Sequence, residues 1–157
     1  MNIQQVYDRF RGGYSDPAAL NYYMFLTYLV DVMQPRHVLE LGTGTGMSAR
    51  MMIQMLPKTS KLTTINWANP PSGDDVGCDL KPWAADRRLV QILGDTRHVS
   101  DQVMGDVDLL FIDSTHEAWH AAEELRLWQD KLQDGAIVAV DDLDQHDMMA
   151  FWDSLPY

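Results

Sequence analysis

The chain has 157 residues, enough for one domain that buries most of its apolar surface without disulfides. Acidic residues outnumber basic ones by 23 to 12; the net charge of −11 excludes a general affinity for nucleic acid phosphates, and the longest apolar segment, 24–33, is too short to span a bilayer. The single cysteine, Cys78, excludes an internal disulfide and no charged and apolar leader opens the sequence, so we expect a cytoplasmic protein that binds neither nucleic acid nor membrane.

Two helices are predicted before the first strand. In residues 2–11 apolar side chains recur at helical spacing on one side, and a glycine pair ends the pattern. A second helix begins with Pro17 in its first turn, where proline is favourable, and its apolar positions continue up to Pro35. We interpret residues 1–35 as N-terminal helices that cover a core formed by residues 36–142.

The most informative stretch, residues 38–48, is an apolar run that ends in an acid and opens into alternating glycines, VLELGTGTGMS. It predicts a buried strand, a tight turn and the start of a helix. Glycine allows a positive φ and lets a ligand approach the backbone, and the free N–H groups of a helix start favour polar or anionic ligands. Gly42, Gly44 and Gly46 have the spacing G-x-G-x-G, which differs from the G-x-G-x-x-G of dinucleotide-binding loops.

A strand–helix–strand unit follows from this turn. Residues 47–56 form a helical pattern and residues 61–66 alternate as a strand that ends at Asn66, an order that predicts a right-handed parallel connection. The next segment, 67–83, has three prolines, two glycines and no periodicity. Such a segment is either a lid or binding loop or a surface insertion, and we keep both interpretations.

Three further strands are predicted over residues 89–93, 107–113 and 136–140, with a helical pattern between the last two. The alternation of strands and helices predicts an α/β fold with a mostly parallel sheet. Ligands of such sheets bind at the carboxyl ends of the strands, where Asp113 and the pair of acids after residue 140 lie.

Four motifs together resemble a known family. In the first, Glu40 lies two residues before the first glycine of the turn and Ser48 two residues after the last. This pattern resembles the first motif of class I S-adenosylmethionine-dependent methyltransferases and is especially similar to the catechol-type O-methyltransferases. The resemblance covers residues 36–142. It implies one Rossmann-like domain over residues 1–157, a three-layer sandwich with strand order 3-2-1-4-5 and a short C-terminal helix over residues 143–157, without the family's usual C-terminal β-hairpin.

The resemblance also implies where S-adenosylmethionine would bind. Glu40 would lie near the amino end of the cofactor, and Ser48 would hold its methionine carboxylate. Asp95, just after the third strand, is the candidate contact of the adenine amino group. The implied cofactor-binding residues are Glu40, Gly42, Thr43, Gly44, Gly46, Ser48, Asn66, Gly94, Asp95 and Asp113.

One of these positions departs from the family pattern. The family usually has an acid at the end of the second strand, which accepts hydrogen bonds from both ribose hydroxyls, and this chain has Asn66. An amide accepts one hydrogen bond and donates another, so we expect a weaker contact. Asp74, Asp75 or Asp79 of the next loop could compensate.

Carboxylates at the ends of the fourth and fifth strands suggest a metal site. Asp113, Asp141 and Asp142 would lie at one edge of the sheet, and hard oxygen donors of this kind suit Mg²⁺. In the catechol-type enzymes an acid and an Asp-Asn pair at these places bind the metal that orients the substrate hydroxyls; here Asp142 replaces the Asn. The alternative is that these acids cap helices or lie in solvated turns.

His116 stands three residues after Asp113, where the catechol-type enzymes carry a catalytic lysine. A helix start and a bound cation would both disfavour the imidazolium, so we expect a neutral imidazole that accepts a proton, with Asp113 as its catalytic partner. The alternative is a histidine that only packs or caps.

These features predict an enzyme, a methyltransferase that methylates an oxygen of a small molecule with metal-assisted substrate binding. Two alternatives stay open. One is a non-catalytic module of the same fold that binds S-adenosylmethionine or docks a partner, and the other is an enzyme related to the cephalosporin-hydroxylase group, which shares these motifs.

The C-terminal part predicts an oligomer. The fifth strand, residues 136–140, is apolar and has no proline or lysine to protect an open edge. The fifteen residues after 142 suffice for one short helix with Met148, Trp152 and Leu155 on one side. We therefore expect a homodimer through the C-terminal sheet edge. The alternative is a monomer whose terminal helix folds back over that edge.

Overall fold

A computed structural model describes residues 2–11, 17–68, 73 and 75–156 of the chain, with side chains for all of these except 17–22. Five strands form one parallel sheet in the order β3-β2-β1-β4-β5, as predicted. The strands are β1 (His37–Leu41), β2 (Lys61–Asn66), β3 (Leu89–Leu93), β4 (Val107–Ile112) and β5 (Leu132–Val140).

The register of the three central strands sets the place of the functional residues. Leu41, the last residue of β1, pairs with Ile65 in β2 and with Ile112 in β4. The turns that follow these strands therefore begin at the same edge of the sheet. Gly42 and Asp113, the first residues after β1 and β4, come out side by side there.

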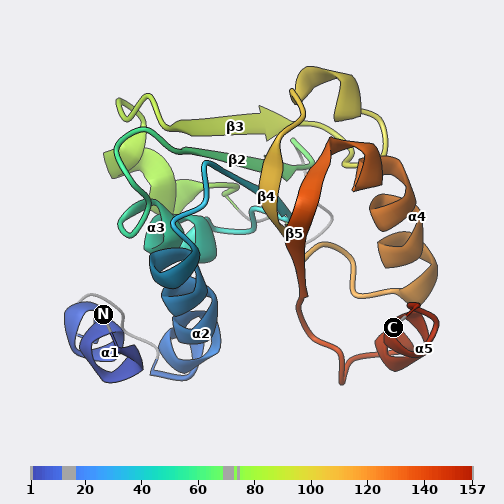
Figure 1. Cartoon of the computed structure of the whole chain (residues 1–157), viewed down its shortest axis with the longest axis horizontal. Helices are drawn as coiled ribbons and strands as arrows, with labels where there is room; N and C mark the ends of the chain where they lie inside the picture. Colours follow the sequence, from blue (N-terminus) through green and yellow to red (C-terminus); the bar gives the residue numbers. More distant parts are fainter. Residues whose placement is uncertain (1, 12–16, 69–72, 74, 157) are drawn as a thin grey trace.

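Helices cover both faces of the sheet and form a three-layer sandwich (Figure 1). One face carries α1, α2 and α3, and the other carries α4 and α5 (Figure 1). The helices are α1 (Ile3–Phe10), α2 (Pro17–Met33), α3 (Met47–Ile53), α4 (Ala118–Trp128) and α5 (Met148–Asp153), with short 3₁₀ helices η1 (Cys78–Trp83), η2 (Ser100–Gln102) and η3 (Gln129–Lys131).

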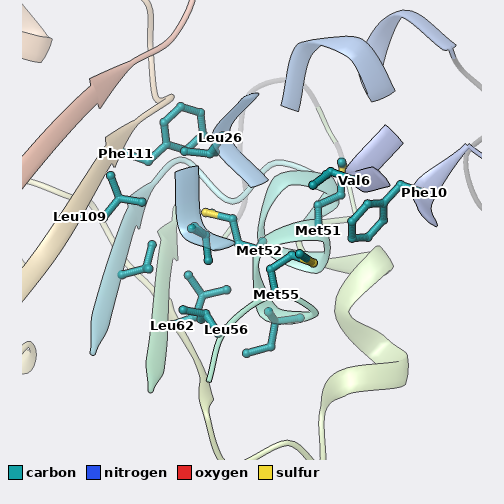
Figure 2. Close-up of a cluster of buried hydrophobic side chains, with 14 of the residues drawn as sticks. Val6, Phe10, Leu26, Met51, Met52, Met55, Leu56, Leu62, Leu109 and Phe111 are labelled. Carbon is teal, nitrogen blue, oxygen red and sulfur yellow. The ribbon is translucent and has the colours of Figure 1, made fainter. Parts of the chain in front are cut away.

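An apolar cluster joins the N-terminal helices to the sheet (Figure 2). Phe10 of α1 packs beside Met51 of α3, and Leu26 of α2 lies against Phe111 of β4 (Figure 2). Burial of such side chains is the main force that holds α2 over the carboxyl half of the sheet. A second cluster, around Trp128, fills the space between the sheet and α4 and α5.

Two elements differ from the sequence prediction. Residues 78–83, expected to be irregular, form η1, and β5 begins at Leu132 instead of residue 136. The early part of β5 contains Gly135 with φ +79° and a register shift opposite β4, which is why a polar, glycine-containing stretch that resembles a turn extends the strand. No helix of the described residues is long and apolar enough to cross a bilayer.

Candidate active site

A cavity of about 670 Å³ lies at the carboxyl ends of the strands, the ligand side of a parallel sheet. Its lining comes from the glycine-rich turn after β1, the turns after β2, β3 and β4, the start of α4, and Tyr23 of α2. The cavity therefore joins the predicted cofactor turn to the predicted catalytic pair, because Gly44 and Ser48 line it together with Asp113 and His116.

The glycines of the turn are required by their surroundings. A Cβ on Gly42 would lie 1.7 Å from the carbonyl oxygen of Asp113, so the turns after β1 and β4 touch only because no side chain is present. Gly44 has φ +49° and open space beside it, which leaves its backbone accessible from the cavity. The arrangement provides the close backbone approach that the sequence predicted.

The 3₁₀ helix η1 packs against this turn. The amide of Gly77 donates to the carbonyl oxygen of Gly44 at 2.9 Å, and the amide of Asp79 donates to that of Thr45 at 2.8 Å. The Thr45 hydroxyl donates to Asp79 Oδ2 at 3.0 Å, and the Leu80 side chain fills the place that a Cβ on Gly46 would occupy. Residues 77–83 are therefore a support of the turn.

Two of the acids expected to compensate for the weaker ribose contact of Asn66 already have other partners. Asp79 is bonded to Thr45, and Asp75 forms an exposed ion pair with Lys81 at 2.7 Å. Asp74 lies outside the described residues. Asn66 itself lines the cavity at the end of β2, and its contact with a ribose stays a prediction.

Glu40 lies beneath the cavity and is fully buried. Its carboxyl group accepts hydrogen bonds from the hydroxyls of Ser48 and Thr64, and Thr64 is also 2.7 Å from the Thr43 hydroxyl. Burial raises the pKa of Glu40 to about 8, although both hydroxyl hydrogen bonds lower it. Ser48 lines the cavity, so Glu40 is linked to the cavity wall through this hydroxyl, and its place beside a cofactor stays a prediction.

The turn after β3 places a different residue in the cavity from the one predicted. Arg97 donates to both carboxylate oxygens of Asp95, at 3.0 and 2.7 Å, and these hydrogen bonds lower the pKa of Asp95 to about 2. Thr96 and Arg97 line the cavity, whereas Asp95 is outside its lining and Gly94 packs near Val99. The adenine contact predicted for Asp95 stays a prediction, with its carboxylate already paired.

Asp113 and His116 meet in the cavity. His116 Nε2 lies 3.1 Å from Asp113 Oδ1 and 3.4 Å from Asp142 Oδ2, and the Tyr23 hydroxyl lies 3.5 Å from Asp113 Oδ2. Burial raises the pKa of Asp113, and the hydrogen bond with His116 opposes this shift. The chain thus forms a group of four polar side chains from α2 and from the ends of β4 and β5.

The pKa of His116 is shifted in the direction opposite to the one expected from the sequence. The hydrogen bond with Asp113 raises its pKa, and burial only partly offsets this effect. The reason is that the imidazole lies between two carboxylates, Asp113 and Asp142, while the helix α4 begins two residues later, at Ala118. His116 therefore favours the imidazolium more than an ordinary histidine does.

The predicted metal ligands do not form a metal site in this arrangement. Within the described part of the chain, no group of three or more His, Cys, Asp or Glu side chains has the geometry to hold a metal ion. His116 lies between Asp113 and Asp142, and the Gln145 amide donates to Asp142 Oδ2 at 2.6 Å. Two of the three predicted ligands, Asp113 and Asp142, thus have His116 or Gln145 as hydrogen-bond or ion-pair partners.

Sequence reasoning missed a second buried acid, Glu124 of α4. The inner face of α4 buries His120, Glu124 and Trp128. Glu124 accepts hydrogen bonds from the hydroxyls of Thr96 and Ser114, which both line the cavity. The only sequence signal was the i, i+4 spacing of His120 and Glu124.

Trp119 is a further cavity residue that the sequence did not single out. More than half of its side chain is exposed, and the Arg97 guanidinium lies over its ring at 5.6 Å. Its indole N–H donates to Glu117 Oε2 at 2.7 Å. An aromatic face is thus held at the wall formed by Thr96, Ser114 and His120.

Comparison with known proteins places this cavity in a family. A family model described as a methyltransferase domain matches residues 39–143, about two thirds of the chain. No curated protein matches the sequence.

Similar solved structures include the SAH-bound methyltransferase PaMTH1 of Podospora anserina, with a TM-score of 0.66 and 18% identity over 88% of this chain and 61% of that one. The O-methyltransferase of Bacillus cereus in complex with SAH has a TM-score of 0.66 and 16% identity over 96% of this chain and 75% of that one. TomG of Streptomyces achromogenes, in complex with SAM, has a TM-score of 0.65 and 20% identity over 98% of this chain and 76% of that one. This chain thus spans three fifths to three quarters of the length of these neighbours. With its sheet order, its glycine-rich turn and the matched family model, the chain belongs to the methyltransferase domain family and has the class I methyltransferase fold.

Proposed function

We propose that this domain transfers the methyl group of S-adenosylmethionine to an oxygen of a small-molecule acceptor. The observation that carries the proposal is a cavity that is lined both by the glycine-rich turn and by the Asp113–His116 pair. A volume of about 670 Å³ lies in the range of small-molecule sites. The family supports methyl transfer, and the O-methyltransferases among the structural neighbours support an oxygen as the acceptor atom.

The residues of the turn fit a cofactor of this kind. Gly44 leaves its backbone open to the cavity, and Thr43 and Ser48 line the cavity beside it. Asn66 stands at the edge where the ribose would lie. When bound, the cofactor supplies an electrophilic methyl group on a sulfonium, so the protein's part is to orient the reactants and to handle one proton.

His116 is the residue that we assign to that proton. With Nε2–H donated to Asp113, the other ring nitrogen, Nδ1, is left to accept the proton of the acceptor hydroxyl. Asp113 and Asp142 then stabilise the imidazolium, and Tyr23 holds the second oxygen of Asp113. The oxygen that loses its proton becomes a stronger nucleophile.

The Mg²⁺ predicted from the sequence competes with this assignment. To bring Asp113, Asp141 and Asp142 around one cation, His116 would have to leave its place between two of them. In this proposal His116 compensates the negative charges of Asp113 and Asp142.

Binding and turnover test the proposal separately. Calorimetry with S-adenosylmethionine should show binding below millimolar concentration, and no binding at that level would contradict the assignment. Methyl transfer is then measured on a panel of small phenols, catechols and hydroxy acids, in chelator and in Mg²⁺. We expect turnover in chelator; turnover only with Mg²⁺ would restore the predicted metal and remove the role given to His116.

Asn66 favours one competing function. An amide at the ribose position binds the two hydroxyls less well than an acid, and a domain that only senses the cofactor tolerates this loss. Cofactor binding without methyl transfer to any acceptor on the panel would support such a binding module. The variant Asn66→Asp should tighten binding in either case, which separates cofactor affinity from catalysis.

A further inference from the structure

A buried carboxylate outside the proposed catalytic pair ties the wall of the cavity together. Glu124 of α4 is 0% exposed, although it is an acidic residue in a helix. Its Oε1 accepts a hydrogen bond from the Thr96 hydroxyl at 2.5 Å and lies 3.1 Å from His120 Nε2. Its Oε2 accepts a hydrogen bond from the Ser114 hydroxyl at 2.8 Å. The proposed proton transfer uses none of these contacts.

The three partners of Glu124 line the cavity and come from separate parts of the chain. Thr96 follows β3, Ser114 follows β4 and His120 lies in α4. The indole N–H of Trp128 also donates to the carbonyl oxygen of Thr96 at 3.0 Å, so this residue is held at its backbone and at its side chain. The polar groups of this wall are therefore fixed by the protein before a ligand binds.

The hydrogen bonds to Glu124 determine whether the polar groups of this wall donate or accept hydrogen bonds in the cavity. A carboxylate accepts hydrogen bonds and donates none, and a hydroxyl has one hydrogen. Thr96 and Ser114 direct that hydrogen to Glu124, so both present only oxygen lone pairs to the cavity. His120, with Nε2–H directed to Glu124, keeps Nδ1 as an acceptor.

A nearby cation has partners of its own. Arg97 also lines the cavity, but its Nε and one terminal nitrogen donate to Asp95 and its guanidinium lies over Trp119. The acceptor character of the wall therefore rests on Glu124.

We propose that Glu124 is a positioning residue that makes this wall a hydrogen-bond acceptor and thereby selects a ligand with an amino group there. The inference rests on the proposed function, since the adenine of S-adenosylmethionine carries such an amino group. Glu124 does not touch the ligand and acts through Thr96 and Ser114. A ligand with an oxygen in place of the amino group would bind more weakly, because its lone pairs would face those of Thr96 and Ser114.

A pair of ligands tests the inference on the whole chain. S-adenosylhomocysteine carries the amino group, and S-inosylhomocysteine carries an oxygen at the same place. We expect calorimetry to show that the wild type prefers the first by about tenfold, the effect of one hydrogen bond. Binding of neither ligand contradicts the proposed function, whereas equal affinity for both overturns this inference and leaves the proposed function standing.

The variant Glu124→Gln turns one hydrogen-bond acceptor of the wall into a donor, while the volume of the side chain stays nearly constant. Its carbonyl oxygen should face Thr96 and His120, which are two donors, and its NH₂ should face Ser114. The Ser114 hydroxyl must then accept and turn its hydrogen to the cavity. We expect the preference for the amino ligand to fall by about tenfold.

The neighbouring Glu123→Gln is the matched control. Glu123 lies on the same helix with a partly exposed side chain and faces Arg126 at 4.0 Å, so this variant should keep the preference. An equal loss of affinity for both ligands in Glu124→Gln would show a merely structural role and overturn the inference. An unchanged preference would overturn it as well.

If Glu124→Gln does not fold, a second pair of variants tests whether this wall selects the ligand with the amino group. Ser114→Ala removes one acceptor from the wall, and Ser114→Thr keeps the hydroxyl. We expect the alanine variant to lose most of the preference for the amino ligand and the threonine variant to retain it. The same preference in both would contradict the role given to this wall.

Discussion

His116 and Asp142 both have a left-handed backbone, each with φ +51°, and their side chains meet with Nε2 and Oδ2 3.4 Å apart. Residues other than glycine adopt this conformation at a cost, and where they do so in a cavity the strain is commonly part of a functional arrangement. Here it brings a side chain after β4 and a side chain after β5 to the same place. The pair therefore holds the imidazole beside Asp113.

The first prediction concerns this imidazole. His116→Gln removes the group that accepts a proton, so we expect kcat to fall by about 100-fold or more, as is usual for loss of a general base. Cofactor affinity, measured by calorimetry, should change little. The control is His98→Gln, because the exposed His98 side chain lies outside the cavity lining. Unchanged kcat in His116→Gln would remove this residue from the mechanism.

The backbone of Asp142 gives a second prediction. Asparagine tolerates a left-handed φ better than alanine does, so Asp142→Ala should lose about 1 kcal/mol more stability than Asp142→Asn. Both substitutions remove the charge that faces His116, so the difference between them reports the backbone together with the exposed hydrogen bond from Gln145. Urea unfolding of the two variants measures it. Equal stabilities would argue against strain at this residue.

The fold could be predicted from the sequence because local patterns determine it. Apolar strands, glycines at the turn and an acid at the end of β4 are local patterns, and parallel pairing brings the strand ends to one edge. The residues missed depend on neighbours that are distant in sequence. Glu124 had the appearance of a solvated helix residue until Thr96 and Ser114 were placed beside it. The raised pKa of His116 likewise depends on Asp142, from another strand end.

The third prediction follows from the raised pKa of Glu40, about 8 in the folded chain against an ordinary value of 4.5. Between these two pH values the folded state holds a proton that the unfolded state has lost. Stability is therefore full below pH 4.5 and falls as pH rises to about 8, by at most about 5 kcal/mol.

Glu40→Gln tests this linkage, because its amide resembles the protonated acid in shape and has no charge to bury. We expect the variant to be more stable than the wild type at pH 8 and to show a flatter change of Tm between pH 5 and about 8. Parallel curves for the two proteins would mean that Glu40 does not carry the pH dependence.

The fourth prediction concerns the support of the glycine-rich turn by η1. Asp79→Ala removes the acceptor of the Thr45 hydroxyl, so the turn should be held less firmly and cofactor affinity should fall by about threefold to tenfold. Asp75→Ala is the matched control, since this acid pairs only at the surface with Lys81. Calorimetry with S-adenosylhomocysteine compares the two. Equal affinities would show that the turn keeps its shape without this contact.

The last prediction concerns the homodimer expected from the sequence, which we retain as a proposal in a more specific form. The helix α5 packs on its own chain, with Met148 and Phe151 buried in the cluster around Trp128. Among the described strands, β5 pairs with β4 alone, and its other edge is open to pairing.

Ile137 lies on this open strand with 38% of its surface exposed, on the same face of the sheet as α2, where Phe25 and Val32 are 64% and 59% exposed. We propose that this edge pairs with a second copy across a two-fold axis. Light scattering after size exclusion at micromolar concentration should give a dimer mass. Ile137→Lys should split the dimer, because a charge would enter the interface, whereas Trp152→Glu on α5 should leave it intact. A monomer at that concentration contradicts the proposal, and a dimer split only by Trp152→Glu would move the interface to α5.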